Sequence, residues 1–300
     1  MFLETSRKEK QLIETEGRRL NVSGVLKILR VSRSGYNYWK HKTPTEKQRK
    51  KEELKDRIRE IHEESYKNYG APKITKALHI ENNKIAEKTV GKYMKEMGIR
   101  AQYIKPYTVT TIDSNFSDEL KNLLNEQFNP DEPNAVWCSD ITYIWTMEGF
   151  VYLTSVMDLF SRKIISWVLS TTLEAKWVVQ AINKAKKVRK ITKPLVMHTD
   201  RGIQYVCNEY KQAIEGFVAS YSKKAYPWDN ACIESFHALL KREWINRYRV
   251  IDYNHAYKLI FEYIETFYNT IRIHSHCDYI SPNKYEQMYE LKSKKYKKSS

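Results

Sequence analysis

The chain has 300 residues, of which 41% are hydrophobic and 29% are charged. This composition is typical of a folded protein with room for two domains, and it excludes a chain that is disordered throughout. No run of about 18 apolar residues and no secretory leader is seen, so we expect a cytoplasmic protein with no membrane partner. The four cysteines have no C-x-x-C spacing, which argues against a zinc ribbon, a disulfide framework and a thioredoxin-type redox pair.

The charge of the chain is strongly basic and unevenly distributed. The 52 Lys and Arg residues outnumber the 36 Asp and Glu residues, giving a net charge of +16. Residues 1–110 carry a net charge of +12, residues 111–283 are neutral, and residues 284–300 carry +4. A basic front on a neutral centre indicates a module that binds a polyanion, joined to a domain with another task. Nucleic acid fits this pattern better than a membrane surface, since no strongly amphipathic basic segment is present.

Residues 1–45 are predicted to contain a first helix-turn-helix. Val25, Leu26 and Leu29 follow helical spacing, and Ser32 is placed to cap a second helix. The side chains that this second helix would direct to a DNA groove are Arg33, Ser34 and Asn37. The alternative is a helix pair that serves only core packing.

Residues 46–110 are predicted to form a second module of the helix-turn-helix type. An amphipathic helix breaks at residues 67–72, and helices are expected at residues 73–78 and 85–98, the latter ended by Gly98. Val90, Met94 and Met97 share one face of that helix. Its basic face carries the proposed DNA contacts Lys88 and Lys92. The alternative is a solvated basic face on a helical linker.

A different pattern begins after a boundary that we expect at residues 101–118. Three strands of an antiparallel meander are predicted, followed by alternating helices and strands, which is typical of an α/β domain with a mixed sheet. The strands are expected at residues 135–145, 150–159, 164–169, 195–198 and 217–221, and the helices at 174–189, 207–215 and 231–248. We assign Trp137, Tyr143 and Trp145 mainly to core packing, with base stacking as the alternative. We expect residues 292–298 to be a frayed basic end in reach of DNA.

Three acidic residues stand at notable places in these segments. Asp140 lies within an otherwise apolar strand, where a carboxylate is costly unless it is paired or bound to a cation. Asp200 follows a short strand, and Glu234 begins the long helix. Each residue alone could be a turn or capping residue. Together they would offer hard oxygen ligands suited to Mg²⁺ or Mn²⁺, and two such ions could promote an in-line displacement at a phosphate.

Several sequence blocks resemble the DDE transposases of two-frame bacterial insertion sequences, which are relatives of retroviral integrases. The blocks are Trp137-x-x-Asp140-Ile141-Thr142-Tyr143, His198-Thr199-Asp200-Arg201-Gly202-x-Gln204-Tyr205, Asp229-Asn230-Ala231-x-x-Glu234-Ser235-Phe236 and Leu240-Lys241-x-Glu243. The segments Tyr69-Gly70-Ala71-Pro72 and Phe267-Tyr268-Asn269-x-x-Arg272-x-His274 extend the likeness over nearly the whole chain.

The resemblance implies a fold, an activity and a set of site residues. The fold would be α/β, a ribonuclease H-like catalytic domain with a mixed five-stranded sheet over residues 111–283, preceded by the helical modules and followed by a basic tail at 284–300. Asp140, Asp200 and Glu234 would be the catalytic residues and would bind two Mg²⁺ or Mn²⁺ ions. Such an enzyme hydrolyses a strand at the end of the mobile element and joins the freed 3′-hydroxyl to other DNA.

The resemblance also implies partners and leaves alternatives open. The double-stranded DNA partners would be the terminal inverted repeats of the element and its target, bound by a homo-oligomer in the bacterial cytosol at the nucleoid. An upstream-frame protein or fusion is a further expected partner. Lys241 lies two helical turns after Glu234 on the same face, where it could hold a DNA phosphate. Thirty-three residues separate Asp200 from Glu234, slightly fewer than is usual in the family.

Two other functions remain compatible with the sequence. The first is a catalytically inert DNA-binding partner or regulator of transposition. The second is a nuclease of the same fold that cleaves a strand without joining it.

Overall fold

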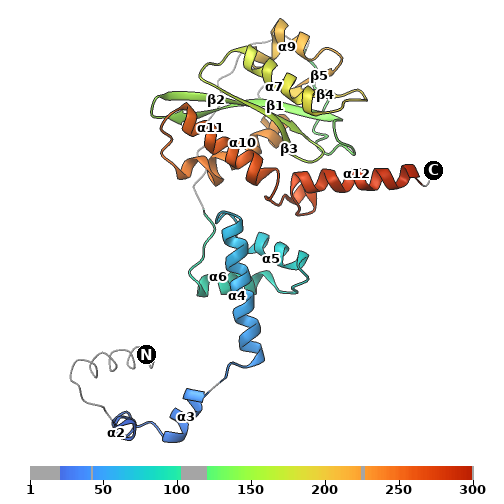
Figure 1. The fold of residues 1–300 in the computed structure, drawn as a ribbon. Coiled ribbons are helices and arrows are strands. Elements are labelled where there is room, and N and C mark those ends of the chain that lie inside the picture. Colours follow the sequence, from blue (N-terminus) through green and yellow to red (C-terminus); the bar gives the residue numbers. More distant parts are fainter. Residues whose placement is uncertain (1–20, 42, 103–119, 224–226, 299–300) are drawn as a thin grey trace. The chain divides into compact units, whose positions relative to one another are not determined.

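The protein is described here by a computed structural model, which places residues 21–41, 43–102, 120–223 and 227–298 (Figure 1). The chain divides into two units, Met1–Asp56 and Arg57–Ser300. The boundary expected at residues 101–118 lies almost entirely outside the described residues. Within these described ranges, no helix is both long and apolar enough to cross a membrane.

The first unit contains the two helices expected near the N-terminus. They are α2 (Val22–Ile28) and α3 (Arg33–His41). The Gly35 N–H donates to Ser32 Oγ at 3.0 Å, so Ser32 caps α3 as predicted. Leu26 is buried, whereas the three proposed groove residues of α3 are exposed: Arg33, Ser34 and Asn37. Their contact with DNA stays a prediction.

The second unit begins within α4 (Glu46–Glu64) and continues through α5 (Ala71–Ile80) and α6 (Glu87–Glu96). Val90 and Met94 are buried on one side of α6, and Lys88 and Lys92 are exposed on another. The turn after α6 has Gly98 at φ +69°, and the Ile99 N–H donates to the Met94 carbonyl at 2.8 Å. A left-handed residue at this point is favourable for glycine, which confirms the predicted helix end.

A five-stranded mixed sheet forms the centre of this unit, as expected. The strands are β1 (Val136–Thr146), β2 (Gly149–Asp158), β3 (Lys163–Ser170), β4 (Val196–Thr199) and β5 (Val218–Tyr221). The first three form the antiparallel meander, while β4 pairs in parallel with both β1 and β5. The resulting order is β3-β2-β1-β4-β5. The strand β4 pairs with β1 only along residues 136–139. Beyond Ser139, the side of β1 opposite to β2 therefore has no neighbouring strand among the described residues, and we call it the open edge of β1.

Helices cover both faces of the sheet (Figure 1). One face carries α7 (Ala175–Val188), α8 (Ile203–Val206) and α9 (Asn208–Ala213), and the other carries α10 (Ala231–Glu243) and α11 (Tyr253–Phe261). Alternate residues of β1 enter different cores: Cys138 and Ile144 pack toward α10, and Trp137 packs toward α7. This arrangement is ribonuclease H-like and confirms the predicted fold class.

The helix predicted over residues 231–248 is shorter than expected. It ends at Glu243, because Trp244 has φ −139° and the chain continues into the 3₁₀ segment η2 (Ile245–Arg247). Trp244 is only 4% exposed and its ring lies 4.8 Å from that of Tyr66. Burying this large ring against the second helical module requires the backbone to leave the helical path.

The expectation of a frayed end at residues 292–298 is wrong. These residues belong to α12 (Pro282–Lys298). The first turns of α12 are anchored by Glu286, whose carboxylate accepts hydrogen bonds from Ser161 at 2.7 Å and from Arg189 at 2.6 Å. Once such buried contacts have fixed the first turns, extending the helix costs little free energy, because each further residue adds a backbone hydrogen bond.

The second helical module packs directly on the sheet domain. The Tyr66 ring contacts the rings of two residues of the sheet domain. One is Trp244, just after α10, and the other is Phe267 in the π-helical segment η3 (Glu262–Tyr268). Arg247 donates to the Tyr66 carbonyl at 2.8 Å, and the Ile273 N–H donates to Tyr69 Oη at 2.8 Å. The two parts share one hydrophobic core. The short 3₁₀ segments η1 (Pro227–Asn230) and η4 (Ser275–Cys277) precede α10 and α12.

Candidate functional site

Asp140 lies on β1 at the point where β4 stops pairing. Its Oδ2 is 3.3 Å from His237 Nδ1, and His237 Nε2 is 3.2 Å from Ser155 Oγ on β2. His237 is buried, with 5% of its surface exposed. The imidazole therefore connects Asp140 to the interior of the sheet and restricts the orientation of its carboxylate.

Asp200 directly follows the last residue of β4, as the sequence predicted. The Gly202 N–H donates to Asp200 Oδ1 at 2.9 Å. A Cβ at Gly202 would stand 3.0 Å from the same oxygen, so the close approach is possible because residue 202 has no side chain. Desolvation and the neighbouring Asp140 raise the pKa of Asp200 to about 6.

Glu234 lies in the first turn of α10 and is exposed. Partial desolvation, together with the negative charges of Asp140 and Asp200, raises its pKa to about 7. The three acids thus interact electrostatically although they come from a strand, a strand end and a helix. Like charges gathered in this way disfavour ionisation unless a cation balances them.

Lys241 lies on the side of α10 that faces β1. Its Nζ is 4.5 Å from the centre of the Tyr143 ring. Burial lowers the pKa of Lys241, and the charge of Asp140 partly opposes that shift. The structure therefore brings Lys241 to the same edge of β1 as Asp140.

The donor set suits a hard divalent cation. Carboxylate oxygens are the ligands that Mg²⁺ and Mn²⁺ prefer, and the mutual repulsion of the three acids is what such a cation would relieve. In the conformation described, the placed residues include no group of three His, Cys, Asp or Glu side chains already close enough to hold a metal ion. Binding of such an ion would require the carboxylates to move closer together.

The expectation that Trp137, Tyr143 and Trp145 are core residues holds only for Trp137. Trp137 is fully buried, whereas Tyr143 is 42% exposed and Trp145 is 63% exposed. The two exposed rings belong to neither hydrophobic core. Strand alternation is the same for a covered and an uncovered face, so the sequence pattern could not separate them.

His237 is a site residue that the sequence reasoning missed. It stands three residues after Glu234, which places both on neighbouring positions of one helical face. That spacing was the available signal. The remaining predicted DNA contacts lie elsewhere: Lys88 and Lys92 on α6, and Arg33, Ser34 and Asn37 in the first unit.

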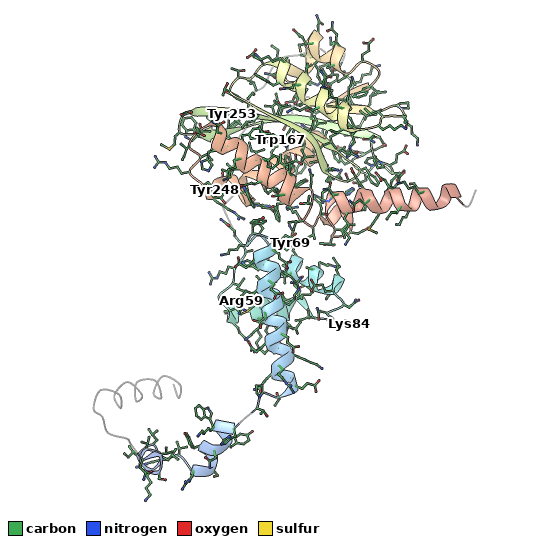
Figure 2. The ribbon with its side chains drawn as sticks, viewed as in Figure 1. Arg59, Tyr69, Lys84, Trp167, Tyr248 and Tyr253 are labelled. Carbon is green, nitrogen blue, oxygen red and sulfur yellow. The ribbon has the colours of Figure 1, made fainter. Side chains whose placement is uncertain are left out.

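A cavity of about 350 Å³ lies at the free side of β3, between α7 and α11. Trp167, Trp177, Tyr253 and Tyr257 are among its lining residues, and Figure 2 marks Trp167 and Tyr253. None of the three acids lines it. This cavity is therefore distinct from the acidic site.

Comparisons with known proteins match both parts of the chain. Residues 130–224 and 215–282 match the integrase core domain, and residues 49–107 match an HTH-like domain. Among solved structures, the chain is similar to the HTLV-2 integrase catalytic core domain in complex with magnesium. That match has 18% identity and a TM-score of 0.37, and covers 48% of this chain and 92% of that chain.

Curated relatives match over almost their full length. The chain is 38% identical to the transposase of insertion sequence element IS904 from Lactococcus lactis, over 82% of this chain and 98% of the relative. It is 32% identical to the transposase InsF of insertion sequence IS3A from Escherichia coli, over 91% of this chain and 96% of the relative. The chain belongs to the family of insertion-sequence transposases that carry an integrase core domain.

Proposed function

We propose that this transposase cleaves a DNA strand at the end of its element and transfers the resulting 3′-hydroxyl to other DNA, with Asp140, Asp200 and Glu234 as the catalytic acids. The observation that carries this proposal is the electrostatic convergence of the three carboxylates at the open edge of β1. Family membership supports a polynucleotidyl transfer reaction in general. The assignment of these particular residues is the proposal.

Each acid has a support that suits a precise task. His237 orients Asp140, and the Gly202 N–H orients Asp200. Glu234 stands in the first turn of α10, where the helix dipole opposes the rise in its pKa caused by burial and by the two aspartates. Two Mg²⁺ or Mn²⁺ ions, when bound by these acids, would polarise the attacked phosphate and lower the pKa of the attacking hydroxyl.

Lys241 is proposed to hold a phosphate of the terminal DNA beside the acids. Its ammonium group lies over the Tyr143 ring and interacts with the charge of Asp140. A lysine in this position adds positive charge to the open edge of β1, where a DNA backbone must pass to reach the acids. A phosphate contact of this kind positions DNA and carries no sequence information by itself.

Recognition of double-stranded DNA is proposed for both helical modules. The exposed residues Lys88 and Lys92 on α6, and Arg33, Ser34 and Asn37 on α3, are the proposed contacts with the element's terminal repeats. We further propose action as a homo-oligomer on DNA in the bacterial cytosol, with or without an upstream-frame protein. The basic excess of residues 1–110 supports the DNA assignment.

A gel assay with labelled duplex carrying the element's end tests the reaction. Wild-type protein, Asp200→Asn and the control Asp131→Asn, which changes an exposed acid outside the site, are compared in Mg²⁺ and in Mn²⁺. We expect nicked and joined products from the wild type and the control, and a loss of at least about a thousand-fold in Asp200→Asn.

The same gel separates the rival functions. Nicked ends without joined products would indicate a nuclease of the same fold. Binding without cleavage, both alone and with the upstream-frame protein, would indicate an inert partner or regulator. Equal cleavage by Asp200→Asn and wild type at equal folding would overturn the assignment of the acids.

A further inference from the structure

The hairpin of β1 and β2 carries an exposed aromatic cluster beside the acidic site. Tyr143, Trp145 and Phe150 are 42%, 63% and 47% exposed, and we name them the hairpin aromatic cluster. Trp145 pairs in register with Phe150 across the two strands. Neither hydrophobic core of the unit includes any of the three residues. A group of large apolar rings exposed together to solvent is typical of a surface that binds another molecule.

The rings are held in a fixed arrangement. The Phe150 ring is 5.3 Å from Tyr143 and 4.8 Å from Trp145, with interplanar angles of 83° and 74°. Edge-to-face pairs of this kind are favourable, and Trp145, the most exposed of the three rings, keeps 63% of its surface in solvent. A further planar ring can therefore reach the exposed surface of Trp145 while the existing pairs stay in place.

The tip of the hairpin is also anchored. The Met147 N–H lies 3.0 Å from both the Val250 and Ile251 carbonyl oxygens, which join the tip to the segment after η2. Thr146 Oγ1 donates to the Gly149 carbonyl within the turn. The cluster is therefore presented on a preformed surface, which reduces the entropy lost when a ligand binds.

Position and charge favour a nucleic-acid ligand. Tyr143 is three residues from Asp140 on the same strand, about 10 Å away along it, and this odd spacing starts the two side chains on opposite faces of the sheet. Lys241 Nζ stands 4.5 Å from the centre of the Tyr143 ring. Arg249 is exposed next to Val250 at the anchored tip, where Glu148 supplies the opposing negative charge. Aromatic faces combined with cations are the features that bind unpaired bases and their phosphates.

From this arrangement we infer that the hairpin aromatic cluster is a stacking platform for unpaired bases of the DNA strand at the element's end. The inference rests on the proposed function, because it takes DNA as the molecule that enters the acidic site. Lys241 would hold a phosphate while the adjacent base stacks on the exposed rings. A strand end separated from its complement in this way would reach Asp140 more easily than a fully paired duplex, whose bases are stacked on each other.

Binding measurements with two DNA probes test the platform. One probe is a duplex of the element's end with three unpaired nucleotides, and the other is the fully paired duplex of the same sequence. Both are measured by fluorescence anisotropy without divalent metal, in the Asp200→Asn background, so that the readout is independent of cleavage. The variants are Trp145→Ala with Phe150→Ala, the conservative Trp145→Phe, and the control Tyr257→Ala. Tyr257 is 44% exposed and lines the separate cavity at β3.

We expect the double alanine variant to bind the unpaired probe about 5-fold to 100-fold more weakly. Its affinity for the paired duplex should stay within about two-fold of the unchanged background, since phosphate contacts dominate that binding. Trp145→Phe should retain most of the preference, and Tyr257→Ala all of it. Thermal unfolding of each variant verifies that the fold is kept, as expected for exposed side chains.

Two results would overturn the inference. An equal loss on both probes, or no loss on either, would show that the rings do not distinguish unpaired bases. A change in oligomeric state of the double variant, measured by light scattering and accompanied by no change in probe preference, would show that the cluster is a contact between copies of the chain. Equal cleavage by Asp200→Asn and the wild type in the gel assay, with an intact probe preference, would count against the catalytic assignment alone.

Discussion

The buried ion pair at the end of α10 gives the sharpest stability prediction. Arg272 donates to Glu243 through two nitrogens, Nε and Nη2, each at 2.7 Å, and Tyr263 Oη donates to the same carboxylate at 2.9 Å. The Arg272 side chain is 5% exposed and that of Glu243 is 9% exposed. Replacing Arg272 by Met keeps the volume apolar but leaves the buried Glu243 carboxylate without its paired cation, while the charge of Lys73 still acts on it.

The expected cost of Arg272→Met is about 3–5 kcal/mol of unfolding free energy. That is a large part of the roughly 5–15 kcal/mol that stabilises a typical domain. The double variant Glu243→Gln with Arg272→Met should recover most of the loss, because it removes both charges together and Tyr263 can donate to the new amide oxygen. As a control, Glu132→Gln removes the exposed pair with Lys193, whose side chains are 36% and 66% exposed, and should cost less than about 1 kcal/mol.

Urea unfolding of the full chain, followed by tryptophan fluorescence, measures these differences. Trp244 follows Glu243 directly and is buried, so it reports on the affected region. The reasoning is refuted if Arg272→Met costs no more than Glu132→Gln, or if the double variant is as unstable as the single one. In the first case the pair would be solvated in solution, and in the second Arg272 would act through packing.

The same pair predicts how stability depends on pH. Burial by itself would raise the pKa of Glu243, but the hydrogen bonds and charge of Arg272, helped by Lys73 and Tyr263, outweigh it and hold the pKa below its ordinary value. A carboxyl whose folded pKa is lowered adds stability above its unfolded pKa, and this is lost as the pH falls through the folded value. In Arg272→Met, burial should raise the pKa of Glu243 instead. The loss of unfolding free energy in this variant, relative to the wild type, should therefore become smaller as the pH falls from 7 to 5. A loss that stays constant over this range would contradict the assigned cause.

Three further predictions concern the acidic site. His237→Ala should raise the Mg²⁺ concentration for half-maximal cleavage about 10-fold to 100-fold, because the proposed metal ligand Asp140 loses the side chain that orients it. An unchanged metal dependence would assign His237 to packing alone. Gly202→Ala should lower the cleavage rate about ten-fold or more with little loss of stability, since the new Cβ would crowd Asp200 Oδ1 at 3.0 Å. Parallel rate and unfolding measurements test this, and full activity would show that the carboxylate can shift freely. Lys241→Ala should weaken binding of the element's end and reduce the slope of log affinity against log salt concentration by about 1. The control Lys211→Ala, which alters an exposed lysine on α9, should change neither. Equal slopes for the two variants would show that Lys241 does not contact the DNA.

Much of the architecture follows from local sequence patterns. Enrichment in β-branched and aromatic residues predicts the three meander strands. Ser32 marks a helix start through its side-chain oxygen, which accepts from the Gly35 N–H, and Gly98 marks a helix end through its left-handed backbone. The order of Asp140, Asp200 and Glu234 along the strands and helix is likewise readable from the sequence. These features depend on neighbours within a few residues, and local periodicity is sufficient to show them.

Other features depend on segments far apart in the chain. Residues 231–248 read as one helix, but the helix ends at Glu243 because Trp244 packs on Tyr66, almost 180 positions earlier in the chain. Residues 292–298 are polar enough to suggest a frayed end, yet they continue a helix that is anchored by Glu286. Neither partner can be recognised from the local pattern.

The acidic site shows the same division. The sequence by itself determined which carboxylates are available and which elements carry them. Only the tertiary structure decided that His237 meets Asp140, that Lys241 reaches the ring of Tyr143, and that Trp145 remains in solvent. The physical reason is that an alternating strand has two equivalent faces, and whether a residue on one of them is buried depends on which distant helix covers it.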